Sequence, residues 1–158
     1  MNNYAFIDGT NLHLSTRHLG WLIDWKAFGE YLRKRHNVTQ ALYFVAYSQQ
    51  YEWIYSYLRN YGYKLIQKPL LKLPDGSTKG NCDTELVLHT MIELDKYDKA
   101  VIVTGDGDMA CLVEYLRSIG KFKLVIACRR DSSSYLIRKA AAGNIMFIDY
   151  FRGKFEKK

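Results

Sequence analysis

Hydrophobic residues along the chain form short continuous runs that alternate with segments of helical periodicity. Runs such as Ala100–Val103 and Leu124–Ala127 are apolar at every position, which is typical of strands that are covered on both faces. The segments predicted as strands are Tyr4–Asp8, Ala41–Tyr47, Lys64–Gln67, Ala100–Thr104, Lys123–Cys128 and Ile145–Ile148.

The segments between these strands have the spacing of amphipathic helices. One of them carries its apolar residues three or four positions apart, at Met109, Leu112, Val113, Leu116 and Ile119. Gly120 follows at a position that favours a left-handed C-cap, so the helix is predicted to end there. The segments predicted as helices are Trp25–Arg35, Tyr51–Asn60, Thr84–Leu94, Met109–Ile119 and Ser133–Ala142.

Strands and helices in this alternation predict a three-layer α/β/α fold around a mainly parallel central sheet with right-handed crossovers. Only Leu70–Lys79 interrupts the alternation, and its Pro74-Asp75-Gly76 turn signal predicts a hairpin or an extended surface loop. A chain of 158 residues has room for one core. We therefore expect a single domain over 1–150, followed by a basic C-terminal tail over 151–158.

Lysine and arginine together number 23 against 16 acidic residues, which gives a formal net charge of +7. Such a surface attracts polyanions, of which nucleic acid is the commonest in cells. No apolar run approaches ~18 residues, so no membrane span is expected. The N-terminus lacks the pattern of a secretion signal, so we expect a cytoplasmic protein. Cys82, Cys111 and Cys128 are odd in number and widely spaced, which argues against a disulfide framework and a zinc site.

Acidic residues fall where strands end and helices begin. Asp8 ends the first strand, Asp83 precedes a helix, and Asp106 and Asp108 follow the strand that ends at Thr104. Ligands of open parallel sheets bind beyond the carboxyl ends of the strands, so these acids are predicted to converge there. Two carboxylates ~5 Å apart repel by roughly 3 kcal/mol at an effective dielectric near 20. An all-oxygen cluster of this kind suits Mg²⁺ or Mn²⁺.

Each acid has a plainer interpretation when it is taken alone. Asp8-Gly9 and Asp106-Gly107 are ordinary turn pairs, and Asp83 and Asp108 are suitable helix caps. The placement of all four at one edge of the sheet is what favours a metal site.

Other motif families fit the same residues less well. Gly105–Ala110 has the G-x-G-x-x-A shape of a dinucleotide-binding turn, but its two acids would repel a pyrophosphate. A calcium loop starting at Asp106 fails, since its sixth and twelfth positions hold Cys111 and Arg117. Ile7–Thr10 resembles part of the motif of haloacid-dehalogenase-type phosphatases. The nucleophile's position in that motif holds Phe6, so the covalent mechanism is unavailable.

Three blocks of the sequence resemble the NYN branch of the PIN-like nucleases, which includes the LabA-like proteins. The blocks are Phe6–Leu12, Lys79–Asp83, and Val103–Asp108 continuing through Leu112–Leu116 to Gly120-Lys121. Their order and spacing span nearly the whole chain. The resemblance implies a Rossmann-like PIN fold and metal-dependent endonucleolytic hydrolysis of RNA phosphodiesters.

The resemblance also implies a metal cage, formed by the matching residues Asp8, Asp83, Asp106 and Asp108. A divalent ion there would activate water and stabilise charge on the phosphorus. Hydrolysis would then proceed without transfer of a phosphoryl group to the enzyme.

Further matching positions take supporting roles. Asn11 would orient a water molecule or the scissile phosphate, Thr104 would support the metal-side loop, and Lys79 would help to hold a phosphate. Arg129 and Arg130 follow a strand and are candidates for backbone contacts, since phosphate binding uses clustered cations; a solvated charged loop explains them equally well. Tyrosine or tryptophan rings near the site would stack on the bases of single-stranded RNA.

One position departs from the family pattern. The terminal helix of the family often ends in Ala-Asp, whereas Gly143-Asn144 stands here. If that acid supports the site in relatives, this protein has lost it or uses Asn144 in its place. A second hypothesis follows, in which the chain is a binding or regulatory module that retains the fold without cleavage. Aromatic-rich faces often associate, so a homodimer is a further possibility.

Overall fold

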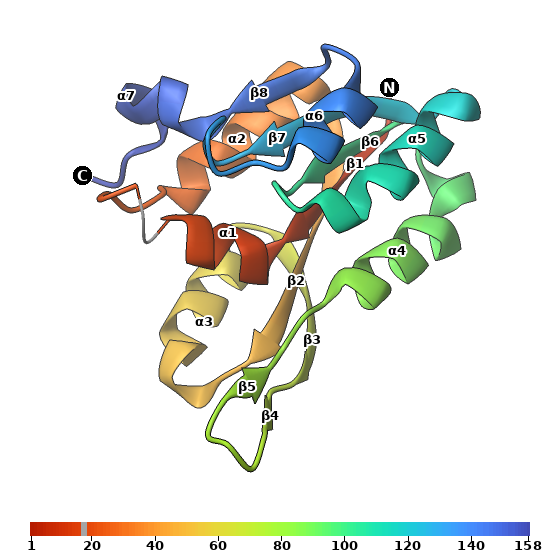
Figure 1. Cartoon of the computed structure of the whole chain (residues 1–158). Helices are drawn as coiled ribbons and strands as arrows, with labels where there is room; N and C mark the ends of the chain where they lie inside the picture. Colours follow the sequence, from red (N-terminus) through yellow and green to blue (C-terminus); the bar gives the residue numbers. More distant parts are fainter. Residues whose placement is uncertain (17–18) are drawn as a thin grey trace.

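The computed structural model describes residues 1–16 and 19–158, with the side chains of 13–18 left aside (Figure 1). Its centre is a six-stranded sheet in the order β3-β2-β1-β6-β7-β8, and every neighbouring pair in this sheet is parallel. The strands are β1 (Asn3–Asp8), β2 (Val38–Tyr47), β3 (Tyr63–Pro69), β6 (Ala100–Val103), β7 (Phe122–Ala127) and β8 (Ile145–Phe147). The predicted parallel sheet is confirmed.

Helices cover both faces of the sheet, which confirms the three-layer architecture (Figure 1). Successive side chains of a strand point to opposite faces. Ala5 and Ile7 of β1 accordingly join one core cluster, with residues of α2 and α3, while Phe6 joins a second cluster, with residues of α4, α5 and α6. The helices are α1 (Gly9–Thr16), α2 (Trp25–His36), α3 (Glu52–Asn60), α4 (Asp83–Ile92), α5 (Ala110–Ser118), α6 (Tyr135–Ala141) and α7 (Arg152–Phe155), with short 3-10 turns η1 (Gln49–Tyr51), η2 (Leu94–Lys96), η3 (Gly107–Met109) and η4 (Ile148–Phe151).

The strand order places a switch point between β1 and β6. From β1 the chain proceeds through β2 to β3 on one side, and from β6 through β7 to β8 on the other. Connections that leave two adjacent parallel strands in opposite directions open a crevice at their carboxyl ends, where such sheets bind ligands. The end of β1 is Asp8, so the fold itself puts a carboxylate in this crevice.

Helix α1 was not predicted from the sequence. It begins at Gly9, directly after β1, without the loop that normally separates a strand from the next helix. The carboxylate of Asp8 accepts a hydrogen bond from the backbone N–H of Asn11 (3.1 Å) in the first turn. Asp8 therefore ends the strand and caps the helix at once, so no loop residue separates the two elements.

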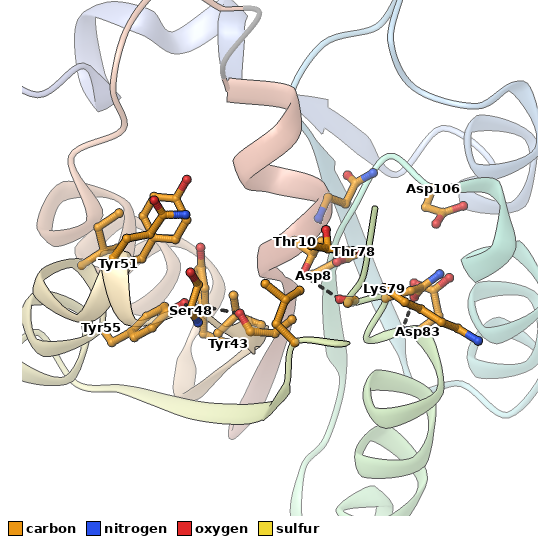
Figure 2. A pocket seen from close by; sticks show the side chains of 18 residues that line it. Asp8, Thr10, Tyr43, Ser48, Tyr51, Tyr55, Thr78, Lys79, Asp83 and Asp106 are labelled. Carbon is orange, nitrogen blue, oxygen red and sulfur yellow. Dashed lines mark hydrogen bonds between the residues drawn. The ribbon is translucent and has the colours of Figure 1, made fainter. Parts of the chain in front are cut away.

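The segment Leu70–Lys79, predicted as either a hairpin or an extended surface loop, is a hairpin. Strand β4 (Leu71–Lys72) pairs antiparallel with β5 (Thr78–Lys79). At its tip, the carboxylate of Asp75 accepts hydrogen bonds from the backbone N–H (2.9 Å) and hydroxyl (2.6 Å) of Ser77. The hairpin brings Lys79 towards the same edge of the sheet as Asp8 (Figure 2).

The C-terminal segment, which we expected to be a basic tail, packs against the domain. Phe155 is fully buried, and its ring lies 5.5 Å from that of Phe28 in α2. Backbone hydrogen bonds join Asp24 N–H to Phe155 C=O (2.7 Å) and Lys157 N–H to Leu22 C=O (2.8 Å). The basic side chains thus extend from a segment that is anchored by an aromatic residue. Among the described residues, no helix is long and apolar enough to cross a bilayer.

Helix α2 depends on Asp24, whose side chain accepts a hydrogen bond from Ala27 N–H (3.1 Å) at the N-cap. Replacing Asp24 with alanine is expected to lower the free energy of unfolding by about 1 kcal/mol, because a backbone donor loses its partner. Asp24→Ser keeps an N-capping oxygen and is expected to restore most of this loss. Urea denaturation of the three proteins measures the difference; equal losses in both variants would contradict the capping role.

Candidate metal centre and adjoining cavity

Three carboxylates meet at the crevice between β1 and β6. One oxygen each from Asp8, Asp83 and Asp106 lies within 4.8 Å of the other two. Asp8 ends β1, Asp83 opens α4, and Asp106 precedes η3 in the loop after β6. These three acids are far apart in the sequence but lie together in the structure, as we expected from their positions at the ends of strands and at the start of a helix (Figure 2).

Asp8 is the buried member of the cluster, with 3% of its surface exposed. Its carboxylate oxygens accept hydrogen bonds from Asn11 N–H (3.1 Å) and from the hydroxyl of Thr104 (3.1 Å). Burial, and after it the charges of Asp83 and Asp106, nevertheless raise the pKa of Asp8 from 3.8 to about 6, although both hydrogen bonds act in the opposite direction. A nearby cation would relieve this cost.

Asp83 and Asp106 are partly exposed, and each is held by its neighbours. The backbone N–H of Asp83 donates to the side-chain oxygen of Asn81 (2.7 Å), and Asp106 accepts a hydrogen bond from Asp108 N–H (2.9 Å). Burial raises the pKa of Asp83, and the charges of Asp106 and Asp108 add to that shift.

Thr104 and Asn11 fix the loop that carries Asp106. The hydroxyl oxygen of Thr104 accepts a hydrogen bond from Asp106 N–H (3.1 Å) while its hydrogen is donated to Asp8. The amide oxygen of Asn11 accepts a hydrogen bond from Gly105 N–H (3.1 Å). The two side chains thus join β1 and α1 to the loop after β6 and set the spacing of the acids.

The remaining predicted site residues lie in different places. Asp108 is exposed and falls outside the three-carboxylate group, although its charge acts on Asp83. Lys79 lines the same cavity as the acids. Arg129 and Arg130 line a separate cavity of about 480 Å³ beside Asp149, and Arg129 is paired with Asp131 at 2.7 Å. Asp149 itself lies 4.0 Å from Arg129, away from the acidic group.

The acidic group has the properties of a cation site. Among residues 1–12 and 19–158, no lysine or arginine forms an ion pair with any of its three carboxylates. At such separations each pair of charges repels by roughly 3 kcal/mol at an effective dielectric near 20. In the described part of the chain its donor atoms are carboxylate oxygens, with no histidine or cysteine in the group, which suits hard divalent ions such as Mg²⁺ and Mn²⁺. Asp8, Asp83 and Asp106 therefore fit a divalent cation.

A cavity of about 600 Å³ extends from the acids towards β2 and α3 (Figure 2). Its far end is lined by Tyr43, Tyr51 and Tyr55. The sequence contains thirteen tyrosines, and nothing in their spacing singled out these three. Gly9, which follows Asp8, packs closely against β2: a Cβ there would overlap the ring of Tyr43 and lie 2.6 Å from the carbonyl oxygen of Phe44. A larger residue at this position would push β2 away from the acids.

The sequence matches the NYN domain over residues 4–149. The chain belongs to the NYN family. NYN domains are PIN-like nuclease domains that generally use divalent metals, so nucleic acid is the substrate class that this family implies.

This NYN domain is similar in sequence to one known protein and in fold to one solved structure. It is 27% identical over 123 residues to the low amplitude and bright protein LabA of Synechococcus elongatus, a match that covers 72% of this chain and 66% of LabA. Its fold is similar to the crystal structure of VPA0982, a protein of unknown function from Vibrio parahaemolyticus, with a TM-score of 0.82 and 24% identity. That similarity covers 99% of this chain and 96% of VPA0982.

Gly143-Asn144, which replaces the Ala-Asp that is common in the family, lies away from the acids of this NYN domain. Asn144 directly precedes β8, and the strands are parallel, so it stands at the amino-terminal edge of the sheet. Its backbone carbonyl accepts a hydrogen bond from Val125 N–H (3.0 Å) at the β7–β8 pairing. The acidic group occupies the opposite, carboxyl edge, so asparagine at this position removes no ligand from it.

Proposed function

We propose that this NYN domain is a divalent-metal-dependent ribonuclease that hydrolyses phosphodiester bonds within single-stranded RNA. The observation that carries the proposal is the convergence of three carboxylate oxygens within 4.8 Å at the switch point of the sheet. Membership of a nuclease-related family and a net charge of +7 support it.

Asp8, Asp83 and Asp106 are the residues that would hold the ion. When bound, a divalent cation supplies Lewis-acid stabilisation of the charge that develops on the phosphodiester and lowers the pKa of the attacking water. The chain's own contribution is geometric: Thr104 and Asn11 fix the distance between Asp8 and the Asp106 loop.

Lys79, at the rim of the cavity, supplies a positive charge that would attract the phosphates of the substrate. Lys79 is exposed on β5, lines the cavity that holds the acids, and is placed to contact a phosphate beside the scissile one. No side-chain nucleophile is required, since water attacks the phosphorus directly. This distinguishes the proposal from a covalent phosphatase mechanism.

A cleavage assay tests the proposal directly. Purified protein is incubated with an end-labelled single-stranded RNA in Mg²⁺, in Mn²⁺ or in EDTA. We expect internal cleavage in at least one metal, none in EDTA, and loss of cleavage in Asp106→Asn. Asp95→Asn is the matched control, because it makes the same chemical change at an exposed acid outside the acidic group.

Two outcomes would overturn the proposal. Equal cleavage by Asp106→Asn and wild type would indicate a contaminating nuclease. RNA binding without product in either metal would favour the regulatory module on the same fold.

A further inference from the structure

The cavity beside the acids has two chemically different ends. The charged residues in the described part of its lining belong to one end; they are Asp8, Lys79, Asp83 and Asp106 (Figure 2). The opposite end is formed by Tyr43, Tyr51, Ile54 and Tyr55, which come from β2, η1 and α3. One continuous space of about 600 Å³ therefore joins an acidic site to an uncharged aromatic pocket.

Three of the four residues that form the aromatic end, Tyr43, Ile54 and Tyr55, are held by the surrounding structure. The hydroxyl of Tyr55 donates to the carbonyl of Ala46 (3.3 Å) and accepts from Ser48 N–H (3.1 Å). Tyr43 and Tyr55 are buried, and Ile54 packs against the core. A pocket with rigid aromatic walls requires little ordering when a ligand enters.

The aromatic end lacks the features of a second phosphate site, because no cationic side chain among residues 1–12 and 19–158 lines it. It suits an uncharged, flat group with polar edges. Ser48 and Gln50 also line this end, and hydroxyl and amide side chains of this kind hydrogen-bond to the edges of bases. A nucleobase has this combination of a stacking face and a polar rim.

We infer that the aromatic end binds one unpaired nucleobase of the RNA strand whose phosphate lies at the acidic cluster. This inference rests on the proposed function, which puts a phosphodiester at the acids. A cavity of about 600 Å³ is of the size that encloses a single small ligand. A base within a duplex is stacked and paired, so only an unstacked base can enter. The site thus selects RNA that is single-stranded at the position next to the cleaved bond.

A binding experiment isolates the base from the backbone. The probe is a strand of about eight stable abasic residues, compared with the same strand carrying one adenine at its centre. Binding is measured by fluorescence anisotropy in EDTA, where cleavage plays no part. Wild-type protein is expected to bind the adenine-bearing strand about tenfold more tightly, which is the effect of stacking one base on an aromatic side chain.

Two variants alter the pocket and one serves as the matched control. Tyr51→Ala removes part of the wall, and Ile54→Trp fills the space; both are expected to reduce the preference to less than about twofold. Trp53→Ala removes an aromatic ring from the same helix, but Trp53 is 63% exposed and does not line the cavity. It is expected to retain the wild-type preference. Thermal melting verifies that all of the variants are folded.

The outcomes separate this inference from the proposed function. No preference for adenine in wild type, or an undiminished preference in both pocket variants, overturns the base pocket even if RNA is cleaved. A preference that is lost in both variants supports the pocket even if cleavage fails, in which case only the proposed ribonuclease activity is wrong.

Discussion

Replacing Asp83 with asparagine is expected to reduce the rate of RNA cleavage by at least ~100-fold. Loss of residues that merely support metal ligands already costs ~10–100-fold in affinity or activity, and Asp83 belongs to the three-carboxylate group itself. The amide retains the size of the side chain but loses its charge. Initial rates of RNA cleavage over a range of Mn²⁺ concentrations measure the loss and show whether excess metal restores activity.

Asp108 provides the matched comparison. It was assigned to the metal cage from the resemblance, but it is exposed and lies outside the three-carboxylate group. We therefore expect Asp108→Asn to slow cleavage by less than ~10-fold, the lower end of the cost of a supporting residue. Losses of the same size in Asp83→Asn and Asp108→Asn would mean that four acids hold the ion, and the three-residue assignment would be wrong.

Asp8→Asn is expected to stabilise the metal-free protein while abolishing its activity. The pKa of Asp8 rises from 3.8 to about 6 on folding, because burial and neighbouring carboxylates disfavour its charged form. A shift of about two pH units corresponds to at most ~3 kcal/mol. The protonated carboxyl contributes this stability fully below about pH 4, and the contribution is lost as the pH rises through about 6. Asparagine stays neutral and avoids the loss.

Thermal or urea unfolding in EDTA at several pH values tests this prediction. The stability difference between Asp8→Asn and wild type should grow between about pH 4 and 6 and then level off. Adding Mg²⁺ should reduce it, since the cation stabilises only the protein that retains the carboxylate. A difference that does not change with pH in EDTA would show that the charge of Asp8 imposes no cost on folding.

The sheet and most helices were predictable because hydrophobic periodicity encodes them directly. The apolar run at Ala100–Val103 is a strand covered on both faces, and the helix over Met109–Ile119 appears as η3 and α5 with Gly120 in the left-handed conformation after it. Helix α1 escaped prediction because its cap, Asp8, also ends a strand.

The acidic site was partly predictable for a different reason. Topology brings the carboxyl ends of adjacent strands together, so Asp8 and Asp106 could be placed from their positions alone. What periodicity does not encode is the course of loops. The loop after β7 carries Arg129 to a separate cavity, where it pairs with Asp131, and the η1 segment brings Tyr51 to the far end of the cavity that adjoins the acids.

The cavity is assembled from two independent parts of the chain. Its acids stand at the ends of β1, β6 and the start of α4, whereas its aromatic wall comes from the β2–α3 connection with the β4–β5 hairpin beside it. We expect substitutions in the wall of the inferred base pocket to change base preference without removing a carboxylate. Under the proposed function, related domains would differ in target preference while sharing one acidic site, and engineering of new cleavage preferences should begin at Ser48–Tyr55.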